Sequence, residues 1–550
     1  MKLLMPVCCI ALFCWSCSSK KQADLIIHHA VIYTVDAHFS RAQAMAVRGG
    51  KIVAVGDDKT ILDNYTASRI EDAAGHFIYP GFIDAHAHFV EYGLSLQQAD
   101  LTGTQSWREV IDRVKAFTGS HPPAAGQWVL GRGWDQNDWP QKSFPDKTLL
   151  DSLFPHTPVL LGRVDGHAAI ANQAALDAAG VHTGQTLGGG VIETRQGKLT
   201  GILIDNAVGL VQDKVPQPTI AYVQKALQEA AANCFAAGLT TIADCGIMKD
   251  AALLIDSLQQ KQLLKMRLYV LLTDSAVNYD YFLPKGPYRT DHINIAGFKC
   301  YADGALGSRG ACLLQDYADK PGWRGFLLHD SSHFAMRAAQ LANTRFQLCT
   351  HAIGDSANRV ILRIYGNVLK GKNDRRWRIE HAQVVAPADI PLFGQYSIIP
   401  SVQPTHATSD MYWAGARLGP ERIHHAYANQ QLLQQNGWMP LGTDFPVEDI
   451  NPLKTFLAAV ARTDASGYPP GGFQKENALT RQQALQGMTI WAAKGCFEEK
   501  SRGSLEAGKL ADFVILDHDL MGVPFNALLN TRVLATFSGG EKVYKAGGVK

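Results

Sequence analysis

Apolar segments of strand length end in side chains that can bind a metal ion at five widely separated places in this chain. They lead into His86 and His88, into Lys299, into His351, into His381 and into Asp444. In a parallel barrel the carboxyl ends of all strands open at one mouth, so residues far apart in sequence meet there. The pattern therefore predicts an α/β fold, a (β/α)8 TIM-like barrel, with a metal site at its mouth.

Helices and strands alternate through the middle of the chain, as a parallel barrel requires. Residues 220–237 have helical spacing, stop at Gly238 and pass into an apolar run at 239–243. Residues 249–264 and 266–272 repeat this order, and helices expected at 331–345 and 355–370 precede the runs ending at His351 and His381. Repeated units of this kind favour a parallel sheet.

The two ends of the chain contain short strands with glycine turns at Gly49-Gly50 and Gly539-Gly540. We predict that residues 24–79 and 496–550 form one small β-sandwich, and that residues 80–495 form the barrel. Residues at about 100–218 are less regular and rich in tryptophan. We interpret them as an insertion that covers the barrel mouth and shapes the substrate pocket.

The N-terminus has the pattern of an export signal. Lys2 precedes an apolar run at 3–15 that is too short to span a bilayer, and Ser16 precedes Cys17. This resembles a bacterial lipoprotein signal, with residues 1–16 removed and Cys17 lipidated at the start of a linker over 17–23. We expect an exported protein, anchored by lipid in the bacterial periplasm or outer membrane. Simple secretion, with Cys17 unmodified, is the alternative.

Composition narrows the range of partners. The net charge is only +2, without a long basic run, so nucleic-acid binding is not expected. The remaining cysteines are scattered without a Cys-x-x-Cys pair, which argues against a zinc ribbon. We expect a small-molecule substrate and contact with the membrane only through Cys17, with a homodimer as the candidate assembly.

The histidines predict a metal site only when they are considered together. His86 and His88 are two residues apart, so in an extended segment both imidazoles point the same way. Each of them, and His351 and His381 likewise, would singly be a surface or core histidine by default. Together, after strands, they predict metal ligands.

Asp444 and Lys299 extend the set. A carboxylate at Asp444 can bind an ion and exchange a proton with water, whereas the alternative is a helix N-cap. An ammonium cannot bind a cation, but reaction of Lys299 with carbon dioxide gives a carbamate able to bridge two ions. The alternative is an ordinary lysine paired with Asp303 or Asp84.

At this point the chain resembles the metal-dependent amidohydrolase superfamily, in the branch similar to N-substituted formamide deformylase (amidohydrolase family 3). The matching segments are 80–88, 299–309, 350–355, 378–383, 442–447 and 505–512. The resemblance implies a distorted (β/α)8 barrel plus a β-sandwich built from both termini. It also implies that His86 and His88 bind one divalent ion, that His351 and His381 bind the other, that carbamylated Lys299 bridges them and that Asp444 completes the first. The histidine-rich set favours zinc, and manganese or iron fits the same ligands.

Pocket residues are suggested by segments near the expected mouth. His167 would hydrogen-bond the substrate or support a metal ligand, and Asp165 lies in the same segment. Trp134 would form an apolar wall or pack in the core. Arg309 would receive a substrate carboxylate or hold a loop.

The resulting hypothesis is an exported hydrolase of non-peptide C–N bonds, of amide or N-acyl type, using a metal-bridging hydroxide and Asp444 as the proton shuttle. A second hypothesis keeps the same site but changes the bond to an ester, a lactone or a cyclic amide. A third is a non-catalytic surface-binding lipoprotein, which would require lost ligands.

Overall fold

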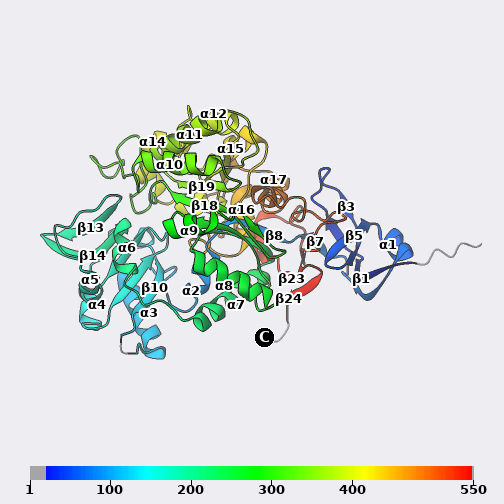
Figure 1. Cartoon of the computed structure of the whole chain (residues 1–550), viewed down its shortest axis with the longest axis horizontal. Helices are drawn as coiled ribbons and strands as arrows, with labels where there is room; N and C mark the ends of the chain where they lie inside the picture. Colours follow the sequence, from blue (N-terminus) through cyan, green and yellow to red (C-terminus); the bar gives the residue numbers. More distant parts are fainter. Residues whose placement is uncertain (1–19, 125, 548–550) are drawn as a thin grey trace, which may run out of the picture.

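A computed structural model describes residues 20–124 and 126–547 of the chain. The expected signal peptide and Cys17 lie outside the described residues. Figure 1 shows a central barrel, an α/β lobe formed by the cyan segments, and a sheet region where the two chain ends meet.

Seven parallel strands form the barrel wall. Their order around the barrel is β21-β20-β19-β18-β16-β15-β8, and the short β17 (Tyr288–Arg289) pairs antiparallel with β18. The strands are β8 (Phe82–Ala87), β15 (Leu239–Ile247), β16 (Arg267–Thr273), β18 (Ile293–Tyr301), β19 (Gln347–Ala352), β20 (Arg378–His381) and β21 (Ile399–Ser401).

An extended segment at 439–444 closes the barrel between β21 and β8. Leu441 bridges to Val402 in parallel, and Ala85 N–H donates to the Leu441 carbonyl at 3.2 Å. Asp444 N–H donates to the His86 carbonyl at 2.8 Å. The predicted TIM-like barrel is confirmed, and this segment takes the place in its wall between β21 and β8.

Helices cover the outside of the barrel and bury apolar faces against the strands. In α7, for example, Thr219 caps the first turn by accepting from Tyr222 N–H, while Ala230, Cys234 and Phe235 face the core. These outer helices include α7 (Ile220–Ala236), α8 (Lys249–Gln260), α9 (Ala276–Phe282), α10 (Ser331–Ala342), α11 (Asp355–Leu369), α12 (Ile390–Gln395), α15 (Asn429–Asn436), α16 (Pro452–Ala461), α17 (Arg481–Gly487) and α18 (Ile490–Gly495). Three further helices lie near the mouth, namely α2 (Phe89–Ser95), α13 (Pro404–Asp410) and α14 (Ala414–Arg422).

The insertion is more regular than its sequence suggests. It forms a six-stranded sheet in the order β13-β14-β12-β11-β10-β9. The elements are β9 (Ala99–Asp100), α3 (Trp107–Ser120), β10 (Val129–Trp134), α4 (Thr148–Leu153), β11 (Val159–Arg163), β12 (Ala168–Ala171), α5 (Gln173–Ala179), β13 (Gly190–Arg195), β14 (Lys198–Asp205) and α6 (Asn206–Gln212). Trp134 and Trp139 pack in a core of the insertion's own with Val110 and Ile170, and Trp107 packs against it. The strands are short and mix parallel with antiparallel pairing, so no simple periodicity revealed them.

Both termini contribute to two packed sheets. One has the order β5-β4-β1-β6 and the other the order β24-β23-β22-β7-β2-β3. Their inner faces share a core that includes Leu25, Met45, Ile78, Phe513 and Phe537. The strands are β1 (Lys21–His28), β2 (Val31–Tyr33), β3 (Arg41–Ala42), β4 (Ala44–Arg48), β5 (Lys51–Gly56), β6 (Tyr65–Asp72), β7 (Phe77–Pro80), β22 (Phe513–Leu516), β23 (Val533–Ser538) and β24 (Glu541–Lys545), with α1 (Asp58–Asn64) alongside. The predicted β-sandwich from both chain ends is therefore confirmed, and Figure 1 shows the blue and red strands meeting beside the barrel.

Among the described residues, no helix combines the length and apolar character needed to cross a bilayer. The six cysteines of this part of the chain are unpaired.

Candidate metal centre

The structure brings all six predicted ligand residues together at the barrel mouth. His86 lies on β8, Lys299 on β18, His351 on β19 and His381 at the end of β20, while His88 and Asp444 follow their strands. All are buried except His88, whose side chain is 17% exposed. The ring centres of His86 and His351 are each 4.7 Å from that of His381.

Asp444 lies at the centre of this group. Its Oδ1 is 3.2 Å from His88 Nε2 and 3.5 Å from His86 Nε2, and its Oδ2 is 4.0 Å from His381 Nδ1. The backbone of Asp444 has a φ of 69°, which is unusual outside glycine, and His381 has a φ of 71°. Strained backbone of this kind often accompanies functional side chains.

Asp84 holds the closing segment of the barrel against its first strand. Its carboxylate accepts from Thr443 N–H at 3.0 Å, from Thr443 Oγ1 at 2.7 Å and from His86 N–H at 3.2 Å. A side chain at Gly442 would place its Cβ 2.6 Å from His86 N, so only glycine allows this approach. Asp84 thereby fixes the spacing between His86 and Asp444.

A buried carboxylate orients His86. Its Nδ1 contacts Glu380 Oε2 at 2.5 Å, and the other oxygen of Glu380 accepts from Arg378 Nε. Burial by itself would raise the pKa of Glu380. Arg378 and His86 lower it by a larger amount, so the pKa falls well below its usual range. With Nδ1 directed to this carboxylate, Nε2 of His86 faces the centre, as a carboxylate behind a metal-bound histidine usually arranges.

Three of the histidines and Asp444 have pKa shifts toward the protonation states that bind a cation, whereas contact with Asp444 raises the pKa of His88 against the opposing effect of burial. Burial, with Lys299 as the next cause, lowers the pKa of His86 to about 4. Burial and the neighbouring imidazoles also lower the pKa of His351 and of His381. Burial raises the pKa of Asp444, but His86 and His88 lower it well below its usual range. Neutral imidazoles and an ionised carboxylate are the forms that bind metals.

Unpartnered atoms at the centre fit a metal. Within the described residues, Asp444 Oδ1, His351 Nε2 and His406 Nε2 are buried without a hydrogen-bond partner. Buried polar atoms are normally satisfied, so unpartnered donor atoms close to one another fit the binding of a cation. Among the described residues, three groups have donor atoms within 4.8 Å of one another, and two of them share Asp444, namely His86, His88 and Asp444, and His381, His406 and Asp444. The residues present therefore fit metal binding.

Lys299 lies within this centre and is fully buried. Its Nζ is 3.4 Å from His86 Nε2. Among the described residues, neither Asp84 nor Asp303 forms an ion pair with it, because Asp84 binds Thr443 and Asp303 accepts from the backbone of Ile353 and Gly354. The alternative of an ordinary lysine paired with Asp303 or Asp84 is therefore wrong.

A cavity of about 960 Å³ opens above the centre. The barrel contributes His351, His381 and Asp444 to its lining, and the insertion contributes Arg132, Asp165 and His167, among others. The interpretation that the insertion shapes the pocket agrees with this arrangement. A cavity of this size accommodates a small molecule.

Comparisons with known proteins agree with this geometry. The family model described as "Amidohydrolase family" matches residues 69–544. The chain is 35% identical over 547 residues to Protein LONG AFTER FAR-RED 3 of Arabidopsis thaliana, covering 95% of this chain and 92% of that protein. It is 26% identical over 551 residues to N-substituted formamide deformylase of Arthrobacter pascens, covering 96% and 99%. The chain belongs to the amidohydrolase family.

A crystal structure supports this membership. An uncharacterized metal-dependent hydrolase from Pyrococcus horikoshii matches with a TM-score of 0.74 and 25% identity, over 91% of this amidohydrolase and 99% of that chain. The amidohydrolase is thus a hydrolytic enzyme with the fold of the metal-dependent hydrolases.

The insertion of the amidohydrolase delivers His167 to the metal centre. The ring of His167 is 4.9 Å from that of His351, centre to centre, and its Nδ1 is 2.7 Å from Asp205 Oδ1. Asp205 has a φ of 52°, and a Cβ at Gly304 or Gly310 would collide with its carboxylate. This packing fixes the carboxylate, so His167 is held with Nδ1 toward Asp205.

Asp165 supports the same turn. It lines the cavity, accepts from His167 N–H at 3.0 Å and pairs with Arg163 at 2.5 Å. Because Arg163 also pairs with Asp135, its charge is balanced by two carboxylates within the insertion.

Trp134 and Arg309 do not line the cavity. Trp134 is fully buried in the core of the insertion, where its Nε1 donates to the Leu161 carbonyl at 2.9 Å, so the prediction of a pocket wall is wrong. Arg309 pairs with Asp319 at 2.8 Å and holds a loop, so its role as a carboxylate receptor is wrong and the loop alternative agrees with the structure. The wide apolar surface of a tryptophan suits a core as well as a pocket, which is why the sequence left both open.

Three residues of the site escaped the sequence analysis. They are Glu380 beside His86, Asp205 beside His167, and His406 beside Asp444. Glu380 directly precedes His381 within an apolar strand, which was a usable signal. Asp205 becomes visible only through strand register, because Ile204 pairs with Ala168. His406 follows a strand of three residues that was not recognised.

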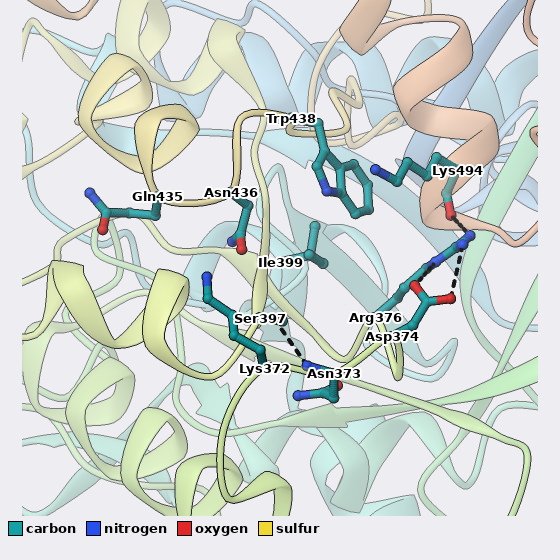
Figure 2. A pocket seen from close by; sticks show the side chains of 10 residues that line it. All are labelled: Lys372, Asn373, Asp374, Arg376, Ser397, Ile399, Gln435, Asn436, Trp438 and Lys494. Atoms are coloured by element: carbon teal, nitrogen blue, oxygen red, sulfur yellow. Dashed lines mark hydrogen bonds and ion pairs between the residues drawn. The ribbon is translucent and has the colours of Figure 1, made fainter.

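A second, smaller cavity of about 310 Å³ lies near the opposite ends of β20 and β21. Figure 2 shows Arg376 in it, bound to the Asp374 carboxylate and to the backbone carbonyl of Lys494. None of the predicted ligands lines it, so it is separate from the metal centre.

Proposed function

We propose that this protein is an exported hydrolase that cleaves non-peptide C–N bonds of amide or N-acyl small molecules at a centre of two divalent ions. The observation that supports this most directly is the convergence of imidazoles on Asp444, with donor atoms left unpartnered. The name of the formamide deformylase relative supports the choice of bond.

The chain offers ligands for two ions. His86 and His88 would hold one with Asp444, and His351 and His381 would hold the other. Lys299, buried without a carboxylate partner in the described residues, would carry the carbamate that bridges them. Zinc is the expected metal, and manganese or iron fits the same donors. When bound, the ions supply Lewis-acid chemistry, so that a shared water loses a proton near neutral pH and a carbonyl is polarised.

Two side chains would handle protons and charge. The Asp444 carboxylate takes the proton of the attacking water and delivers it to the leaving nitrogen, which departs as an amine. Burial by itself would lower the pKa of His167. Asp205 raises it by a larger amount, so the pKa lies above its usual value. With Nδ1 held toward Asp205, the other ring nitrogen of His167 would hydrogen-bond the substrate oxygen as charge develops.

Matched substrates test the choice of bond. We expect the zinc-loaded enzyme to hydrolyse N-acyl compounds faster than esters of the same acyl and side groups, because Asp444 can protonate a poor leaving group. Faster turnover of esters, lactones or cyclic amides across the panel would favour the second hypothesis. Absence of zinc after reconstitution would favour the binding lipoprotein.

Export and lipidation at Cys17 form a separate part of the proposal, supported by the apolar run and Ser16-Cys17. We expect labelled palmitate to be incorporated into the full chain and lost in Cys17→Ala, with Cys14→Ala as the matched control. Incorporation that survives Cys17→Ala would contradict the anchor.

A further inference from the structure

His406 is a buried histidine for which neither the strand pattern nor the proposed ligand set has a role. It lies in the first turn of α13, is only 9% exposed, and lines the large cavity. Within the described residues its Nε2 has no hydrogen-bond partner. That nitrogen is 3.4 Å from Asp444 Oδ2. A buried nitrogen left unpaired at this place requires an explanation.

His381 faces the same point from the end of β20. Its Nδ1 is 2.7 Å from Gln403 Oε1, so the amide of Gln403 fixes the ring. The rings of His381 and His406 are stacked at 5.7 Å with an interplanar angle of 21°. Gln403 and His406 belong to one short segment after β21, which therefore both orients one imidazole and supplies another.

The two oxygens of Asp444 face different histidine pairs. Oδ1 lies near His86 and His88, whereas Oδ2 lies near His381 and His406. In each case the carboxylate and two imidazoles have donor atoms within 4.8 Å of one another. Three such ligands plus an open position form an ordinary zinc site.

We propose that His406 is a ligand of the second divalent ion, together with His381 and Asp444, and that Asp444 joins the two ion positions through its two oxygens. This inference rests on the proposed binuclear function. It adds a ligand to the second ion without removing His351 or Lys299 from the centre.

Metal content tests the inference without any substrate. The full chain, His406→Ala and His406→Gln would be loaded with zinc, dialysed, and titrated with a competing chelator. We expect two equivalents in the unmodified protein. In both variants the second should bind more than about 100-fold more weakly than in the unmodified protein, since loss of a direct ligand should exceed the 10–100-fold cost of losing a supporting contact. The first equivalent should keep its affinity.

Two controls sharpen the result. His424→Ala removes an exposed histidine of the following segment and should leave both equivalents unchanged. Added imidazole should restore the second equivalent in His406→Ala, because the deleted ring borders the open cavity. Circular dichroism and Tm would show that each variant is folded, and His406→Gln, which keeps hydrogen-bonding capacity, tests the inference if the alanine variant does not fold.

The outcomes separate the two proposals. Wild-type zinc affinity in His406→Gln, whether the unmodified protein holds one equivalent or two, would overturn the role of His406 and leave it as a substrate contact. A chain that binds no zinc at all would overturn the proposed function as well.

Discussion

The barrel and the insertion present side chains to one cavity in different ways. In the barrel, each donor is fixed by its strand and by a neighbour, as Glu380 fixes His86 and Asp84 fixes the segment before Asp444. In the insertion, the charged groups facing the cavity are paired with each other, as His167 is with Asp205 and Arg163 with Asp165. The barrel therefore keeps donors unpaired for an ion, whereas the insertion keeps its charges balanced and directs one histidine inward.

The largest expected effect is in the barrel. Asp444→Asn should lower kcat/KM by about 10³-fold or more, because the amide cannot accept the proton that the leaving nitrogen needs. Steady-state kinetics together with zinc content would measure this. If Asp444→Asn keeps full turnover with zinc still bound, Asp444 does not transfer the proton. The proposed difference between the barrel and the insertion would then be wrong.

A smaller effect should follow when the support of a barrel donor is changed. Glu380→Gln should weaken zinc binding by about 10–100-fold, because His86 loses the carboxylate that orients it. Chelator competition measures the affinity. Glu499→Gln is the matched control, because it breaks the pair with Arg376 at the other end of the barrel and should leave zinc binding unchanged.

A change in the insertion should alter the catalytic rate but not the zinc content. Asp205→Asn should reduce kcat by about 10- to 100-fold while the zinc content stays constant, since a misdirected histidine costs general acid–base or hydrogen-bond catalysis but no ligand. The pH profile of kcat should shift to lower pH, because the carboxylate raises the pKa of His167. Asp177→Asn, an exposed residue of the same insertion, should have neither effect. Loss of zinc in Asp205→Asn would show that the two regions are not independent.

The smallest effect concerns stability. Asp138 lines the cavity and is exposed, so solvent screens its charge and the effect on stability is small. Desolvation, with Asp135 as the next cause, raises its pKa to about 6 from the ordinary value of 3.8. The folded state then holds a proton that the unfolded chain releases, so stability falls as pH rises from about 4 to 6 and stays lower above. Asp138→Asn should raise Tm by about 1 °C at pH 7.5 and not at pH 3.5, measured by thermal scans. An equal change at both pH values would contradict this origin.

The barrel and the insertion also differ in how many of their site residues could be predicted from the sequence alone. Strand-end placement predicted the meeting of His86, His351 and Asp444, because a parallel barrel forces its carboxyl ends together. It could not find His406, which stands on a helix turn beyond a strand of only three residues. Asp205 meets His167 across 38 positions through antiparallel register, which no local pattern encodes.

The carboxylate of Asp84 touches Thr443, 359 positions further along the chain. Most of the polypeptide must therefore be synthesised before His86 and His88 can lie beside Asp444. No early fragment could hold His86 and Asp444 together in this geometry, because both depend on the contact between Asp84 and Thr443.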